Sequence, residues 1–168
     1  VGPGLYPKLP VKVVAADEIG TDLVADAVAA RARAPGASIV VDFGTALTFT
    51  AISADGLIEG VAIAPGLGTA INALTNSTAQ LPSVPLVAPP SALGRNTVQA
   101  IQSGVVFGYA GLVESVVRRM KSELGGSATV IATGGLHRVV APLVGIFDAV
   151  EPTLTLDGLA LIARAVGP

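Results

Sequence analysis

The 168-residue sequence contains no cysteine and a single histidine, His137. Without cysteine the chain cannot have a disulfide framework, and with only one histidine it cannot form an ordinary zinc site. Charged residues make up only 13% of the chain, against about 25% in a typical globular domain. Because charge covers so little of the surface, we expect another domain or a second copy of the chain to cover part of it.

A basic cluster is also missing. The 10 basic residues are outnumbered by 12 acidic ones, which argues against nucleic acid or an anionic membrane as a partner. No unbroken apolar run approaches the roughly 18 residues of a transmembrane helix. The opening stretch, VGPGLYPKLP, lacks the regions of a signal peptide, and without an initiator methionine it suggests a cut inside a longer protein. We expect a cytoplasmic protein.

Hydrophobic periodicity predicts an α/β fold. Strand patterns occupy 11–15, 39–42, 47–53, 57–64, 128–132 and 147–150, with a hairpin turn signal at Ala54-Asp55-Gly56. Helices are expected over 21–34, 69–78, 97–124, 136–143 and 156–166, and the prolines within 80–96 predict an extended connection. Three sequential strands followed by alternating helices and strands indicate a mixed sheet with helices on its faces.

The longest predicted helix, 97–124, carries Gly104, Gly108 and Gly111. Glycine inside a helix costs about 1 kcal/mol relative to alanine. Three of them therefore indicate a face kept free of side chains, either for close contact with another helix or for tight packing against the protein's own sheet.

Asp42 ends an apolar strand in the stretch SIVVDFGTALTFT. A carboxylate in that position is costly to desolvate unless a positive or hydrogen-bonding group meets it. The partner is either local, a backbone N–H two residues on, as in an Asp-Gly turn, or a cation held next to the turn.

Glycine-rich turns follow two predicted strands, at 42–45 and 133–135. Amides at such turns bind phosphates, so Gly44 with Thr45 is a candidate phosphate contact, and the flat surface of Gly134 and Gly135 suits a nucleoside. Strand-end glycines also serve turn geometry alone. Asp22, at the start of a predicted helix, has a similarly plain alternative as a favourable charge at the helix N-terminus.

Several common motifs are missing. The dinucleotide fingerprint fails because Ile71 stands where its third glycine belongs, and the chain has no Gly-x-x-x-x-Gly-Lys-Ser/Thr loop. A Ser-His-Asp triad would have to use His137, which we expect to be solvated on a surface helix.

Four segments in order, VDFGTALTFTAISADG, GVAIAPGL, LGRNTVQAIQSGVVFGY and VIATGGL, resemble the type III pantothenate kinases. The resemblance covers nearly the whole chain. It implies the actin-like ATPase (ribonuclease H-like) superfold of sugar kinases and Hsp70, an α/β domain with a mixed sheet and helices on both faces. This domain would span 35–168, and 1–34 would cross from an N-terminal domain missing here and carry the substrate-side helix.

The resemblance also implies the reaction and its site. The reaction would be ATP-dependent phosphorylation of pantothenate to 4'-phosphopantothenate, the first step of coenzyme A biosynthesis, by a homodimer with its substrate pocket near the subunit interface. Mg²⁺ would accompany ATP. The implied roles are proton acceptor for Asp22, substrate contacts for Gly20, Thr21, Asp22, Leu23 and Thr97, monovalent-cation ligand (K⁺ or NH₄⁺) for Asp42, and ATP contacts for Gly44, Thr45, Gly134 and Gly135.

The chain departs from the family pattern in three places. The N-terminal Asp-x-Gly-Asn-Thr loop that grips ATP phosphates is absent, Leu23 replaces an arginine near the pantothenate carboxylate, and Thr50 stands where many members have aspartate. The change at Leu23 keeps a second interpretation open, a ligand-binding or regulatory relative that has lost turnover.

Overall fold

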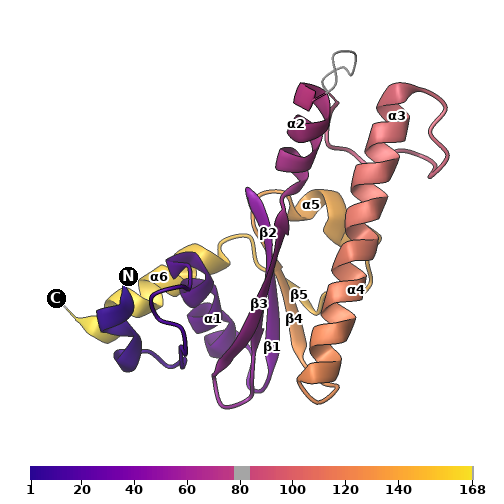
Figure 1. Ribbon diagram of the computed structural model, residues 1–168. Helices are drawn as coiled ribbons and strands as arrows, with labels where there is room; N and C mark the ends of the chain where they lie inside the picture. Colours follow the sequence, from indigo (N-terminus) through magenta and orange to yellow (C-terminus); the bar gives the residue numbers. More distant parts are fainter. Residues whose placement is uncertain (78–83, 168) are drawn as a thin grey trace.

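A computed structural model describes residues 1–77 and 84–167. A five-stranded sheet lies between two layers of helices (Figure 1). Its strands are β1 (Ser38–Phe43), β2 (Ala46–Ile52), β3 (Ile58–Pro65), β4 (Thr129–Thr133) and β5 (Ala149–Val150), in the order β3-β2-β1-β4-β5. β1 pairs antiparallel with β2 and parallel with β4, so the predicted mixed sheet is confirmed.

The sheet has a separate apolar core on each face. Alternating side chains of β1 point to opposite sides, so Val40 joins one core while Ile39 and Val41 join the other. The helices are α1 (Thr21–Arg33), α2 (Leu67–Ser77), α3 (Thr97–Gln102), α4 (Gly108–Glu123), α5 (His137–Val140) and α6 (Leu154–Val166). α1 and α6 cover one core, and α4 with α5 covers the other, which confirms helices on both faces.

Most predicted elements are present, and one strand prediction is wrong. Within residues 11–15 only Lys12 pairs, through an isolated bridge with Leu57 at the β2–β3 hairpin. The Lys12 N–H donates to the Gly56 carbonyl at 2.8 Å, and after that the chain turns away. The end of the predicted helix 69–78, at Thr78, and residues 80–83 of the predicted connection lie outside the described residues.

Residues 1–34 share a core with the sheet. Tyr6, which lies in a short 3-10 helix (η1, Pro3–Lys8), and Val11 pack with α1, α6 and the β1 residue Val40. The boundary at residue 34 stays a prediction.

Residues Thr97–Glu123 form one continuous helix of 27 residues, in which a π-helical turn (η2, Ser103–Phe107) joins α3 to α4. A Cβ added to Gly104, Gly108 or Gly111 would meet no described atom within 4 Å. These glycines therefore do not serve tight packing against the protein's own sheet, at least within the described residues.

The same long helix is the one described segment that could cross a membrane by length and composition. Polar residues interrupt its apolar run, so a search for an unbroken apolar stretch does not find it. Core helices of soluble proteins have the same length and composition, so these two properties do not identify a membrane span.

α1 and α6 lie in close contact at Gly158. A Cβ on this glycine would overlap the carbonyl group of Ala25. Because that neighbour is backbone within a buried helix, it cannot give way as a flexible side chain would.

We therefore expect Gly158→Ala to lower the free energy of unfolding by about 2 kcal/mol or more through overpacking. Gly68→Ala is the matched control, because it adds the same methyl group inside a helix, α2, where the nearest atom outside that helix is the Leu136 Cδ1 atom at 3.9 Å. That variant is expected to gain up to about 1 kcal/mol from helix propensity. Denaturant unfolding of both proteins measures the difference, and equal stability would contradict the packing argument.

Candidate functional site

Three loops meet at one edge of the sheet. The carboxyl ends of the parallel strands β1 and β4 lie together at this edge, since Asp42 is in register with Thr133. The end of β3 reaches it as well, because Pro65 pairs with Ala46 at the start of β2. The predicted phosphate turn after β1 and the predicted nucleoside turn after β4 are thus neighbours.

Glycines allow these loops to touch. Gly134 has a φ of +85°, and a Cβ there would overlap the Asp42 carboxylate and the Phe43 backbone. A Cβ on Gly66 would likewise overlap the carbonyl oxygens of Gly44 and Thr45. The Gly66 N–H donates to the Thr45 carbonyl at 2.9 Å, which fixes the two turns together.

Asp42 is half-buried at this edge, opposite Thr48 across the β1–β2 pair. Burial raises the pKa of its carboxyl above the ordinary value, and the negative charge of Asp22 raises it further. Among the described residues, no ion pair or hydrogen bond to its side chain accounts for the charge. A Cβ on Gly44 would lie 3.8 Å from both carboxylate oxygens, so the glycine turn after β1 lies directly beside the carboxylate.

Asp22 lies on the exposed first turn of α1. Its carboxylate folds back over Gly20, the residue before the helix, where a Cβ would overlap the Oδ1 atom. The effect of Asp22 on the pKa of Asp42 shows that the two carboxylates are within electrostatic range of each other. The structure therefore brings these two predicted residues together.

Asp26 is a third carboxylate that sequence reasoning missed. It is only 1% exposed and lies one helical turn after Asp22 on α1. The signal was an acid inside the apolar run LVADAVAA, a position where a charge is costly. In the described part of the chain, however, no group of three or more acidic, histidine or cysteine side chains is placed to hold a metal ion.

An apolar pocket of about 390 Å³ adjoins the first turn of α1. Gly20 and Leu23 line it, together with Val61 and Ile63 on the exposed face of β3. Its only charged lining residues within the described chain are acidic, Glu18 among them. Thr21 is exposed beside it.

Thr97 lies away from the other predicted site residues. It is the exposed first residue of α3, which Figure 1 shows on the opposite side of the molecule from α1. It lines a separate open pocket of about 770 Å³ with Arg95, between α3 and α2. A single chain therefore does not bring Thr97 to Asp22.

The expectation that His137 is solvated is wrong. The side chain is only 7% exposed, and its Nδ1 atom lies 2.6 Å from the Gly134 carbonyl oxygen. Its helix, α5, folds back under the turn after β4, so His137 supports that turn. This placement removes it from any surface triad.

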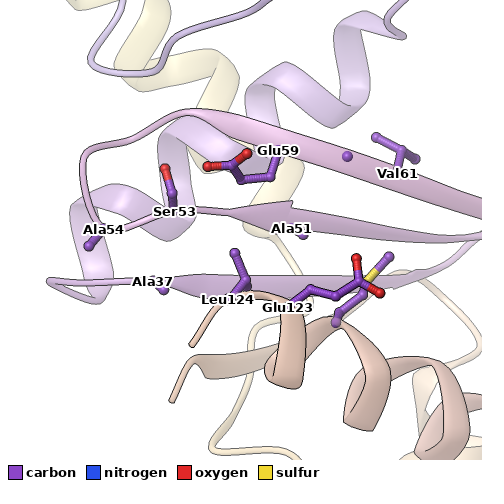
Figure 2. A pocket seen from close by; sticks show the side chains of 10 residues that line it. Ala37, Ala51, Ser53, Ala54, Glu59, Val61, Glu123 and Leu124 are labelled. Carbon is purple, nitrogen blue, oxygen red and sulfur yellow. The ribbon is translucent and has the colours of Figure 1, made fainter. Parts of the chain in front are cut away.

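A further hollow of about 540 Å³ lies at the other end of the sheet (Figure 2). It opens between the β2–β3 hairpin and the last turn of α4, with Glu59 and Glu123 on facing walls. None of the predicted site residues lines it.

Comparisons with known proteins agree with the resemblance seen in the motifs. A family model described as type III pantothenate kinase matches residues 1–119. Type III pantothenate kinases from Dehalococcoides mccartyi strain CBDB1 and Moorella thermoacetica are 47% and 46% identical over 162 residues, which is 96% of this chain. A type III pantothenate kinase from Thermomicrobium roseum is 54% identical over 151 residues. The chain covers 62%, 64% and 58% of these three relatives, respectively.

A solved structure shows the same fold. A Campylobacter jejuni protein provisionally assigned as a Baf family transcriptional activator superimposes with a TM-score of 0.66 at 21% identity. The superposition covers 95% of this chain and 70% of that one. It confirms the predicted α/β actin-like ATPase fold and shows nothing beyond the fold.

Proposed function

The chain belongs to the type III pantothenate kinase family, and from that premise we propose that its protein transfers a phosphoryl group from ATP to pantothenate. The product would be 4'-phosphopantothenate, which enters coenzyme A biosynthesis. The observation that carries the proposal is the arrangement of two carboxylates within electrostatic range of each other, Asp42 beside two glycine-rich turns and Asp22 at the start of the helix that borders an apolar pocket. Phosphoryl transfer needs a base near the acceptor hydroxyl, neutralisation of the phosphate charge and correct positioning of the phosphates.

Asp22 would accept the proton of the pantothenate hydroxyl. As the acceptor oxygen bonds to the γ-phosphorus of ATP, the bond from that phosphorus to the bridging oxygen breaks, ADP leaves, and the proton passes to Asp22. An ordinary carboxylate suffices because the hydroxyl becomes acidic as the transfer proceeds. The exposure of Asp22 at the edge of the pocket supports this role.

Asp42 would hold a monovalent cation, K⁺ or NH₄⁺. A half-buried carboxylate without a cationic partner among the described residues fits such an ion. One carboxylate suits a monovalent ion better than Mg²⁺, which we expect to arrive on the ATP phosphates. The ions would offset phosphate charge.

ATP would lie across the two neighbouring turns. The exposed Thr45, with Gly44, would contact the phosphates. Gly134 and the open surface at Gly135, where a Cβ would meet nothing within 4 Å, would face the adenosine.

We propose a homodimer because one chain separates Thr97 from Asp22. If both contact the same pantothenate, Thr97 must come from a second copy. The exposed glycines of the long helix are the candidate contact surface.

Gly108→Leu is therefore expected to shift the protein from dimer to monomer at low micromolar concentration, because the new side chain would hold the two helices apart. Sedimentation velocity measures the change. Ser122→Leu, an exposed position near the end of the same helix, is the control and should remain dimeric. A dimeric Gly108→Leu protein would exclude this surface.

Leu23 favours a second candidate function, in which the protein binds its ligand but does not catalyse a reaction. Leu23 is buried and leaves the pocket without a basic residue among those that line it. A carboxylate substrate would then lack a cation in this subunit.

The test is product analysis by mass spectrometry on the longest natural form of the protein that contains these residues. With Mg-ATP, K⁺ and pantothenate we expect phosphopantothenate in stoichiometric yield with ADP. Binding of ATP without product would favour the second candidate. We expect the activity in the cytoplasm, with neither nucleic acid nor membrane as partner.

A further inference from the structure

Asp26 forms a side-chain link between α1 and α6. The Thr155 hydroxyl, in the first turn of α6, donates a hydrogen bond of 2.6 Å to the Asp26 Oδ1 atom. The other carboxylate oxygen, Oδ2, is buried and has no hydrogen-bond partner among the described residues. A buried polar atom without a partner is rare and costly, so it calls for an explanation beyond packing.

The link lies beside a close backbone contact between the two helices. Gly158 of α6 packs on the Ala25 carbonyl, the residue next to Asp26. The Asp26 carboxyl is thereby enclosed by two helices, one of which carries Asp22 one turn earlier.

We propose that Asp26 is a positioning residue, a hydrogen-bond clamp between α1 and α6 that holds the turn carrying Asp22 against the strand end carrying Asp42. The proposal rests on the proposed function, because it assigns Asp22 and Asp42 to the reaction. A small displacement of a catalytic base lowers the reaction rate strongly, because the reacting groups must be held at near-attack distances.

The electrostatics lower the cost of leaving the second oxygen without a partner, because a neutral carboxyl is less costly to bury than a charged one. Burial raises the pKa of Asp26 to about 7 against the lowering effect of the Thr155 hydrogen bond, and the charges of Asp42 and Asp22 raise it further. The charged residue of α6 nearest in sequence to Thr155, Asp157, is paired with Arg33 instead. Below pH 7 the clamp is therefore largely protonated and adds no third negative charge where phosphates would bind.

Three variants separate the clamp from general packing. Asp26→Asn keeps the shape and the hydrogen bond but cannot ionise. Asp26→Leu keeps the approximate volume and removes the hydrogen bond, and Thr155→Val removes the donor with little change in shape. Each is assayed for kcat and for ATP affinity from pH 6 to 9.

We expect the kcat of the natural protein to decline above pH 7, and we expect Asp26→Asn to keep kcat within about threefold at pH 6.5 and to lose that decline. Asp26→Leu and Thr155→Val should lower kcat about tenfold or more with ATP affinity unchanged. The proposal is overturned if these two variants turn over at the natural rate, if Asp26→Asn is as impaired as Asp26→Leu, or if the pH profiles of the natural protein and Asp26→Asn coincide.

A second readout does not depend on turnover. Amide hydrogen exchange across 21–26 should be faster in Thr155→Val, because the first turn of α1 loses its tie to α6. If the natural protein has no kinase activity, the proposed function fails, and the clamp is judged on exchange alone. Unchanged exchange in that variant would overturn it.

Discussion

Asp22→Asn is expected to lower kcat for pantothenate phosphorylation by about two to four orders of magnitude, the usual contribution of a general base. The amide keeps the size and much of the hydrogen bonding of the carboxylate but cannot accept the proton. Because Asp22 is exposed and not part of either core, the variant should fold normally. Steady-state ADP release with Mg-ATP and K⁺ measures the effect.

Asp17→Asn is the matched control for this prediction. It removes an exposed carboxylate from the loop before α1, five residues from Asp22, and should leave kcat within about twofold because the side chain lies outside the described pockets. If Asp22→Asn retains turnover close to that of this control, Asp22 is not the base.

Asp26→Asn is expected to stabilise the protein at pH 8 and to change its stability little at pH 4. The folded-state pKa of Asp26 is raised from 3.8 to about 7, so its contribution to stability is complete at low pH and is lost as the pH rises through 7. Over that shift the protein loses about 4 kcal/mol of its free energy of unfolding. The Asp26→Asn variant would not show this loss, because asparagine does not ionise. Denaturant unfolding at both pH values measures the difference, with pH 4 as the internal reference.

This result would separate two views of Asp26. A gain confined to high pH means that the buried carboxyl is neutral when the fold is most stable. An equal loss at both pH values would mean instead that the carboxylate has a partner that asparagine cannot satisfy, and the explanation of its electrostatics would be wrong.

Local sequence signals predicted the central part of the fold well. β1 and β2 are apolar runs joined to a third strand by a turn with glycine at its left-handed position, Gly56, and these signals are short-range. The prediction for 11–15 failed because a strand needs a partner strand, and only Lys12 finds one. Periodicity alone contains no information about such pairing.

The candidate site was only partly predictable. Asp42 and the two glycine turns follow strands, so their convergence can be inferred from parallel pairing. Asp26 was missed because helix patterns place acids toward solvent, whereas α6 covers this one. The separation of Thr97 from Asp22 depends on where the long helix points, a tertiary feature that residue spacing does not contain.

We propose that this chain carries the acceptor side of a pantothenate kinase. The most direct test is ADP release by the longest natural form of the protein, measured with Mg-ATP and K⁺ in the presence and absence of pantothenate. We expect ADP release that depends on pantothenate and is largely lost in Asp22→Asn. A protein that binds ATP but releases ADP at the same low rate with and without pantothenate would contradict it.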